Sequence, residues 1–340
     1  MNSMKKSSNM PAKGVCSRWA LSGPATCKSA MHPVWLLLGL LFISPVQAES
    51  RAGLLSDGLL KASELHGEGF PKQLVDPLGG TVLFQQPPQR IVSVTLASDE
   101  MLADLGAMPA VVGVTHLVDN PDLSNVAGRY PAAVTRVGGD IESILALQPD
   151  LVIVASYTRI ETVRLLLGAG LPVLRLKAPE TLADLKANLW LLAELTGHQD
   201  RARIITNSLH IPKSTEVDPP RVLYYDLSGS SVGPGDLTHE LISLAGGYNV
   251  MLDTGLKGFQ PLNTEQAISL QPEIILLSGW ATQTEAVNRL LAEPAWQHVP
   301  AVEQRRVCAL TGAWRSSASH FRWQGLAKIS ACLKAQESLP

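Results

Sequence analysis

"DIESILALQPDLVIV" (residues 140–154) has a counterpart later in the chain, "NTEQAISLQPEIILL" (residues 263–277). The two stretches share a glutamate, a Leu-Gln-Pro run, an acidic residue after the proline and a closing apolar run. Asp or Asn before a short amphipathic segment is typical of a helix N-cap, and an apolar run bounded by turn residues is typical of a buried strand. The repeat therefore predicts the same helix–turn–strand unit at corresponding positions of two lobes.

The segments around each copy alternate between strand and helix patterns. Predicted strands of the first half are 90–95, 110–115, 150–154 and 172–176, and its further helices are 98–107, with Ser98 as N-cap, and 159–170. In the second half, strands 221–227, 273–279 and 306–310 alternate with helices near 236–245, 284–292 and 319–335. We therefore expect an α/β fold of two lobes, each a mainly parallel sheet flanked by helices.

Composition changes divide the chain into five parts. We expect a signal peptide at 1–48, an N-terminal segment with a hairpin at 49–89, a first lobe at 90–178, a connecting helix and linker at 179–220, and a second lobe at 221–340. The connecting helical stretch runs from about Thr181 to Leu209 and is interrupted near Gly197. The hairpin is predicted from "DPLGG" at 76–80, which separates two short apolar runs.

The first 48 residues indicate export. A basic lead without acidic residues precedes the apolar run at 34–43, which is about half of the ~20 residues that a membrane span needs. We expect cleavage near Ala48 and a periplasmic mature chain, and either Met1 or Met31 could be the start. Removing the five basic residues of the leader from 28 leaves 23 against 30 acidic residues, a net charge of −7.

The mature chain lacks the marks of several function classes. It has no basic stripe, which argues against nucleic acid as a partner, and we expect a monomer. The sequence holds no P-loop, Cys-x-x-Cys, His-Glu-x-x-His or Gly-x-Ser-x-Gly motif, and the Gly-rich "GSSVGPG" at 229–235 lacks a lysine and is predicted to be a cleft loop. His116 with Asp119 and Asp122 offers the alternative of a metal-dependent enzyme, although no other histidine is close in sequence.

Two cysteines, Cys308 and Cys332, remain after the signal peptide. Export permits a disulfide between them, and two buried free thiols are the alternative. Sequence alone does not give the Cα separation on which a disulfide depends.

Several motifs together resemble one protein family. "PPQRIVSVTLASDEMLADLGA", the two repeats and "PAWQHVPAVEQRRVCALTGAW" are similar to segments of periplasmic substrate-binding proteins for ferric siderophores, haem and cobalamin, and the resemblance runs from about residue 74 to 335. It implies two lobes bridged by a long helix, a ligand cleft between them, no enzymatic activity and no cofactor. It also implies delivery to an ABC importer, with Glu142 and Glu265 docking on the two permease subunits.

Candidate cleft residues follow from the rule that α/β sheets bind ligands beyond the carboxyl ends of their strands. They are Thr95, Leu96, Ser98, His116, Tyr157 and Arg159 in the first lobe, and Ser230, Trp280, Trp314 and Arg315 in the second. The resemblance implies a metal chelate as ligand, either a ferric siderophore or a corrinoid. Haem is the alternative ligand. It ranks below the other two because "RVGGDIES" lacks the tyrosine that haem-binding relatives carry before the first docking helix.

Overall fold

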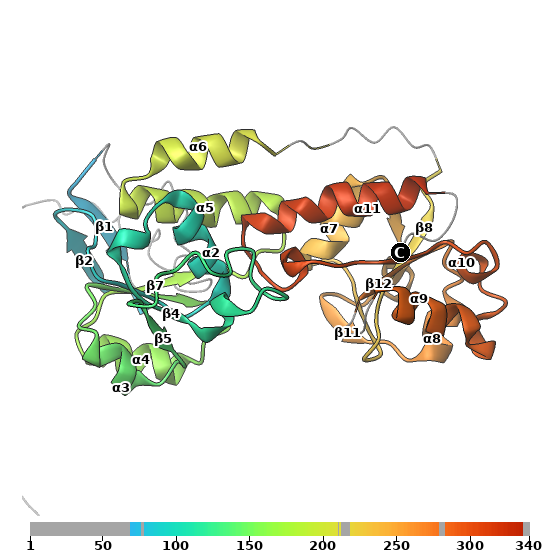
Figure 1. Ribbon diagram of the computed structural model, residues 1–340, viewed down its shortest axis with the longest axis horizontal. Helices are drawn as coiled ribbons and strands as arrows, with labels where there is room; N and C mark the ends of the chain where they lie inside the picture. Colours follow the sequence, from blue (N-terminus) through green and yellow to red (C-terminus); the bar gives the residue numbers. More distant parts are fainter. Residues whose placement is uncertain (1–68, 76–77, 210, 212–217, 279–282, 336–340) are drawn as a thin grey trace, which may run out of the picture. The chain divides into compact units, whose positions relative to one another are not determined.

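The structure is a computed structural model that describes residues 69–75, 78–209, 211, 218–278 and 283–335 (Figure 1). The predicted signal peptide lies outside these residues. Within the described ranges, no helix is both long and apolar enough to cross a membrane.

The first lobe is built on a parallel sheet in the order β5-β4-β3-β6-β7. Its strands are β3 (Ile91–Ser93), β4 (Val111–Thr115), β5 (Thr135–Val137), β6 (Leu151–Ala155) and β7 (Val173–Leu176). Helices α3 (Ile141–Ala146) and α4 (Ile160–Gly168) pack on one face, and α2 (Leu96–Leu105) packs on the other. Every residue of β6 is buried because helices cover both faces of the sheet, so the strand is apolar throughout rather than alternating.

The second lobe contains a mixed sheet in the order β11-β9-β8-β12-β13, with β10 also paired to β8. Its strands are β8 (Arg221–Asp226), β9 (Ser230–Val232), β10 (Tyr248–Asn249), β11 (Phe259–Pro261), β12 (Ile274–Ser278) and β13 (Val307–Ala309). Helices α7 (Leu237–Leu244) and α11 (Gln324–Lys334) pack on one face, and α8 (Thr264–Ser269), α9 (Gln283–Ala292) and α10 (Pro300–Glu303) pack on the other. The fold class is therefore as predicted: two α/β lobes with mainly parallel sheets flanked by helices.

Two local predictions were wrong. Residues 230–232 form strand β9, antiparallel to β8 and β11, whereas the glycines around them had indicated a loop. Helix α2 begins earlier than expected, because Thr95 rather than Ser98 is its N-cap: the Thr95 hydroxyl accepts a hydrogen bond from the Ser98 N–H at 3.1 Å. Both serine and threonine cap helices well, so the sequence could not separate them.

The connecting stretch consists of two helices, α5 (Leu182–Thr196) and α6 (Gln199–Asn207). The predicted interruption near Gly197 is confirmed, since this glycine adopts the left-handed conformation (φ 76°) that ends α5. The bridge between the lobes is thus a pair of helices followed by a linker, of which 212–217 lie outside the described residues.

Two further connections lie near the two ends of the described part of the chain. The predicted hairpin is formed by β1 (Lys72–Val75) and β2 (Thr81–Phe84), and the buried Lys72 ammonium binds the Glu194 carboxylate of α5 at 2.5 Å. Cys308 and Cys332 form a disulfide with a Cα–Cα distance of 6.0 Å, which links β13 to α11. The structure therefore decides for the disulfide over free thiols.

The sequence repeat is a structural repeat as well. Asp140 and Asn263 are the N-caps of α3 and α8, and each accepts a hydrogen bond from the backbone N–H three residues later, at 2.8 and 2.9 Å. The glutamines of the two Gln-Pro pairs, Gln148 and Gln271, have almost the same left-handed φ, 45° and 46°. Each proline then leads into a fully buried strand, β6 or β12.

An arginine and a carboxylate join the repeat to the neighbouring strand in the first lobe, and we call this arrangement the clamp. Arg90, just before β3, donates to the Leu147 and Gln148 carbonyls at the end of α3, with the shortest distance 2.6 Å. Asp150, just before β6, accepts hydrogen bonds from the backbone N–H groups of Gln89 and Arg90 at 2.7 and 2.9 Å. Charged groups thereby satisfy a helix end and a strand start together.

The second lobe repeats the clamp with different residues. Arg221, at the start of β8, donates to the Leu270 carbonyl at the end of α8 at 2.8 Å and pairs with Asp253 at 2.7 Å. Glu273, before β12, accepts from the Arg221 N–H at 2.8 Å. The duplication therefore extends beyond the helix, turn and strand to the strand beside them.

We predict that Arg90→Met lowers the free energy of unfolding by about 1–2 kcal/mol, because it leaves the carbonyls at the end of α3 without their charged donor. Urea denaturation followed by circular dichroism measures the change. The control is Arg164→Met, since Arg164 is an exposed arginine on α4 of the same lobe. A loss no larger than that of the control would contradict the clamp.

Candidate ligand-binding site

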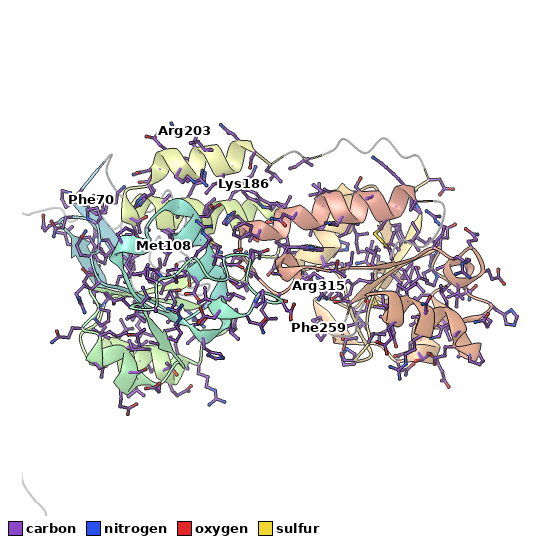
Figure 2. All side chains as sticks on the ribbon, viewed as in Figure 1. Phe70, Met108, Lys186, Arg203, Phe259 and Arg315 are labelled. Carbon is purple, nitrogen blue, oxygen red and sulfur yellow. A yellow bond between two sulfur atoms is a disulfide. The ribbon has the colours of Figure 1, made fainter. Side chains whose placement is uncertain are left out.

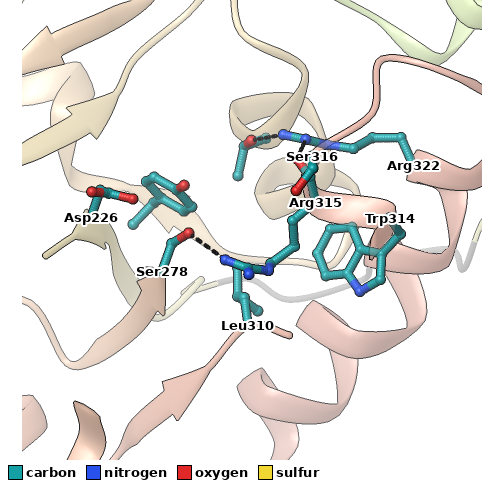
Figure 3. Close-up of a pocket in the computed structure, with 9 residues that line it drawn as sticks. Asp226, Ser278, Leu310, Trp314, Arg315, Ser316 and Arg322 are labelled. Atoms are coloured by element: carbon teal, nitrogen blue, oxygen red, sulfur yellow. Dashed lines mark hydrogen bonds between the residues drawn. The ribbon is translucent and has the colours of Figure 1, made fainter. Parts of the chain in front are cut away.

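A pocket of about 130 Å³ opens at the carboxyl ends of β8 and β12 in the second lobe (Figure 3). Tyr224 and Asp226 come from β8, Ser278 ends β12 and Thr238 lies in the first turn of α7. The remaining wall is the segment after β13, with Leu310, Trp314, Arg315, Ser316 and Arg322. The position agrees with the rule that α/β sheets bind ligands beyond the carboxyl ends of their strands.

Two guanidinium groups dominate the polar wall of this pocket. Arg315 Nη1 donates to the Ser278 hydroxyl at 2.9 Å, and Arg322 Nη2 donates to the Thr238 hydroxyl at 2.6 Å (Figure 3). Arg322 also donates to the backbone carbonyl of Arg315. Burial lowers the pKa of Arg322 from its ordinary value and outweighs the opposing effects of the Asp236 carboxylate and the Tyr224 phenol.

Trp314 lines the pocket, but its indole is only 3% exposed. Its ring packs on Gly325 of α11, where an added Cβ would approach within 2.3 Å, and its N–H donates to the Thr311 carbonyl at 2.6 Å. The Arg322 guanidinium lies 5.9 Å from the ring centroid. The tryptophan therefore supports Arg322 and fixes the loop, and it leaves little aromatic surface for stacking on a ligand.

The first lobe brings together only some of its predicted residues. Thr95 and Tyr157 line one small pocket with Ala97 and Lys177, and Tyr157 is 69% exposed. Leu96 and Ser98 are buried, and Ser98 is occupied by hydrogen bonds to the hydroxyls of Ser93 and Thr95 at 2.6 and 2.7 Å. We therefore correct the expectation that Leu96 and Ser98 face a ligand, because α2 turns them into the core.

The other predicted residues are dispersed. Arg159, the exposed residue before α4, and His116, exposed after β4, line none of the described pockets. Ser230 is buried in β9, opposite Asp226, and Trp280 lies outside the described residues. Arg315 is therefore the predicted residue whose charged group lies in the wall of the second-lobe pocket (Figure 3).

The His116 cluster does not form a metal site. Arg136 binds the Asp119 carboxylate through two nitrogens at 2.7 and 2.8 Å, so this carboxylate is already paired. Among the residues that the structure describes, no group of three His, Cys, Asp or Glu side chains is arranged to hold a metal.

Sequence reasoning missed Arg322, Thr238, Ser278 and Tyr224. The pocket takes these side chains from four separate elements, and no local motif marks such a gathering. Arg322 lies seven residues after the predicted Arg315, in "HFRWQG" before the last helix. In the sequence this position resembles that of an ordinary surface arginine.

Phe259 on β11 lies outside the pocket. With 60% of its surface exposed, it was also not anticipated from the sequence (Figure 2).

The segment that carries the two arginines is tied to the first lobe. The Ser319 hydroxyl binds the buried Glu100 carboxylate of α2 at 2.5 Å, and His320 Nε2 lies 2.9 Å from Asp104 Oδ2 of the same helix. The hydrogen bond with His320 is the main cause that lowers the pKa of Asp104 to about 2, so this carboxylate is charged at neutral pH. The pocket wall of one lobe is therefore held by the other lobe.

The two predicted docking glutamates occupy equivalent positions. Glu142 and Glu265 are each the second residue of their helix, and both are exposed. Neither forms an ion pair with any other described residue. A glutamate in the first helical turn is also favoured by the helix dipole, so the position alone does not establish a partner.

A family model described as periplasmic binding protein matches residues 91–313. The chain belongs to this family. Among solved structures, this periplasmic binding protein is similar to the periplasmic heme-binding protein RhuT from Roseiflexus sp. RS-1, in apo form. The TM-score is 0.55 at 25% identity, with 72% of this chain and 97% of that chain covered. The likeness confirms the predicted family and fold.

Two curated relatives carry names that state a ligand. The chain is 25% identical over 242 residues to a cobalamin-binding protein of Halobacterium salinarum, which covers 66% of this chain and 63% of that protein. It is 25% identical over 247 residues to the Fe(3+) dicitrate-binding periplasmic protein FecB of Escherichia coli strain K12, covering 68% of this chain and 79% of that one. The chain thus spans somewhat less than two thirds of the length of the Halobacterium relative.

Asp99, in the first turn of α2, is a buried carboxylate of the first lobe. Its Oδ2 accepts hydrogen bonds from the N–H and the hydroxyl of Thr115 at 3.1 and 2.7 Å, and its Oδ1 has no partner. Burial is the main cause that raises the pKa of Asp99 from 3.8 to about 7. A carboxyl group whose pKa rises on folding destabilises the fold when it is charged, so its cost appears above the unfolded pKa and is complete above the folded one.

We predict that Asp99→Asn stabilises the protein more at pH 8 than at pH 4, by up to about 4 kcal/mol in the free energy of unfolding. Urea denaturation across this pH range measures the difference from the unsubstituted protein. The control is Asp140→Asn, because hydrogen bonds with Ser143 lower the pKa of Asp140 and its pH trend must have the opposite sign. If the difference in the free energy of unfolding between Asp99→Asn and the unsubstituted protein were constant with pH, it would contradict the raised pKa of Asp99.

Proposed function

We propose that this periplasmic binding protein captures a metal chelate, either a ferric siderophore or a corrinoid, and delivers it to an ABC importer. The observation that carries the proposal is the pocket at the carboxyl ends of β8 and β12, in a chain whose relatives are named for metal chelates. The signal peptide at 1–48 is removed near Ala48, and the mature chain acts as a monomer in the periplasm without catalysing a reaction.

The size of the pocket bears on how the chelate is held. Drug-sized ligands occupy pockets of roughly 300–1,000 Å³, so a pocket of about 130 Å³ receives only one part of a chelate. The remainder lies against the first lobe, where Thr95 and the exposed Tyr157 share a second pocket. Closure of the lobes on the ligand then depends on the α2 contacts with Ser319 and His320.

Haem is the second candidate ligand. Tyrosine is an established axial ligand of haem iron, and Tyr157 presents an exposed phenol beside the first-lobe pocket. The similar structure of RhuT, which is named for heme, supports keeping this candidate.

The importer meets the two lobes through Glu142 and Glu265. A permease built from two like subunits presents two equivalent basic pockets, and the duplicated helices α3 and α8 offer one exposed carboxylate to each. Electrostatic complementarity of this kind sets orientation and association rate more than it sets affinity for the chelate.

Tryptophan fluorescence of the mature protein, residues 49–340, tests the capture of a chelate. We expect saturable quenching at one-to-one stoichiometry by a single member of a panel of ferric siderophores, cyanocobalamin and haemin, because Trp314 lines the pocket. Free tryptophan titrated in parallel corrects for absorption by the ligands. An absence of quenching by every chelate, with circular dichroism showing a folded protein, would contradict the proposed function.

A second experiment tests the docking surface. Glu265→Lys and Glu142→Lys are each expected to reduce stimulation of the importer in proteoliposomes at least tenfold and to leave chelate affinity unchanged, because the lysine repels the basic pocket of the permease. Glu161→Lys is the matched control, since Glu161 is also an exposed second residue of a helix, α4, but lies outside the repeat. Full stimulation by Glu265→Lys would exclude this docking surface.

A further inference from the structure

A second cavity, of about 320 Å³, is lined by α6, by α2 and by the segment that joins β13 to α11, and we call it the α6 cavity. Its volume lies in the range of roughly 300–1,000 Å³ that is typical of small-molecule sites. No residue that lines it also lines the second-lobe pocket. The side chains that carry the argument below are Arg201, Ile204, His320, Phe321 and Trp323.

One stretch of chain, residues 314–324, forms a wall of both sites. Arg315 and Arg322 line the second-lobe pocket, whereas His320 and Trp323 line the α6 cavity. The same stretch carries the two hydrogen bonds to α2 of the first lobe. A molecule in the α6 cavity therefore touches a connecting helix and the segment that joins the lobes.

Part of the lining of the α6 cavity is apolar and reaches the surface. Ile204 of α6 is 61% exposed, although it is a large aliphatic side chain. Phe321 is half-buried, and the indole of Trp323 is buried. These side chains come from two different elements, so an apolar body between them would remove surface of both elements from water.

The same lining holds polar groups with unused hydrogen-bonding capacity. Arg201 donates from Nε to the backbone carbonyl of Asp104 at 2.8 Å and from Nη2 to its carboxylate at 3.0 Å, which uses two of its five donors. The Trp323 indole N–H and His320 Nδ1 are buried and have no hydrogen-bond partner among the described residues. Since buried polar groups are nearly always paired, the indole N–H favours a ligand that carries an acceptor.

The charges around the α6 cavity favour an anion. Asp104 is the acidic residue of the lining, and Arg201 and Arg129 share it, with nitrogen–oxygen distances of 3.0 and 3.6 Å. Asp200, on the same helix as Arg201, is already paired with Arg203 at 2.9 Å. Two arginines around one carboxylate leave a positive charge, so an anionic group near Arg201 gains a partner and a cation is repelled.

We propose that the α6 cavity binds a small organic anion with an apolar body, such as an aromatic carboxylate or sulfonate. Its anionic group pairs with Arg201, and its apolar body packs on Ile204 and Phe321. An oxygen of the ligand accepts a hydrogen bond from the Trp323 N–H. The occupant joins α6 to residues 320–324 and stiffens the contact between the lobes. The site is separate from chelate capture and does not depend on it.

Two dyes that differ by one sulfonate test the site. 8-Anilinonaphthalene-1-sulfonate carries the anion, and N-phenyl-1-naphthylamine is the same molecule without it. In fluorescence titrations of the mature protein we expect one saturable site for the sulfonate dye, with a Kd about tenfold below that of the neutral dye, because only the sulfonate pairs with Arg201. Hydrogen exchange of the amides in 319–324 should slow when the sulfonate dye is bound.

Variants of α6 separate the two parts of the site. Arg201→Gln is expected to weaken the sulfonate dye about tenfold and to leave the neutral dye nearly unchanged, since it removes the charge alone. Ile204→Glu should weaken both dyes, and the sulfonate dye more, because it replaces apolar surface by a negative charge. The matched control is Leu165→Glu, since Leu165 is 59% exposed on α4 and lies outside the cavity. Arg315→Gln, in the second-lobe pocket, should leave both affinities unchanged.

Circular dichroism shows whether each variant is folded. Ile204→Glu alone provides the test if Arg201→Gln disturbs the contact with Asp104, because Ile204 is an exposed side chain. Equal affinities for the two dyes, or affinities that neither α6 variant changes, would overturn the inference. A loss of sulfonate binding in Arg315→Gln would place the dye in the second-lobe pocket and would overturn it as well. None of these results bears on chelate capture, which the tryptophan titration tests.

Discussion

The first strand of each half and the repeat beside it depend on one interaction, the clamp between an arginine and a carboxylate. In the first lobe Arg90 satisfies the end of α3 while Asp150 satisfies the start of β3, and Arg221 and Glu273 do the same in the second lobe. In the first lobe these groups lie at the exposed amino end of the sheet, where charged side chains take the place of water as hydrogen-bond partners. The clamp thereby fixes the helix whose first turn carries the exposed glutamate.

Anchoring at the amino ends of the strands leaves their carboxyl ends for a ligand. The pocket at the ends of β8 and β12 is closed by the segment that follows β13, and this segment also contacts α2 of the first lobe through Ser319 and His320. The arginines that face the pocket are therefore positioned by both lobes. The pocket wall and the contact between the lobes therefore share one stretch of chain.

The repeat made much of the fold predictable from sequence, because N-caps, the Gln-Pro turn and continuous apolar strands are local patterns. The interruption at Gly197 and the hairpin at "DPLGG" were predictable for the same reason. The pocket was not, because Arg322, Thr238 and Ser278 become neighbours only through the packing of separate elements. Leu96 and Ser98 were assigned to the ligand because they follow the first strand, but α2 already begins at Leu96 and turns both side chains into the core.

Native mass spectrometry of the protein isolated from the periplasm of cells that express the full chain tests the account most directly. Cells grown with ferric citrate, a ferric hydroxamate and cobalamin together let the ligands compete for the same protein. The account predicts a one-to-one complex whose added mass is that of a single metal chelate, either a ferric complex or cobalamin. A protein that carries no small molecule, or only one without a metal, would contradict it.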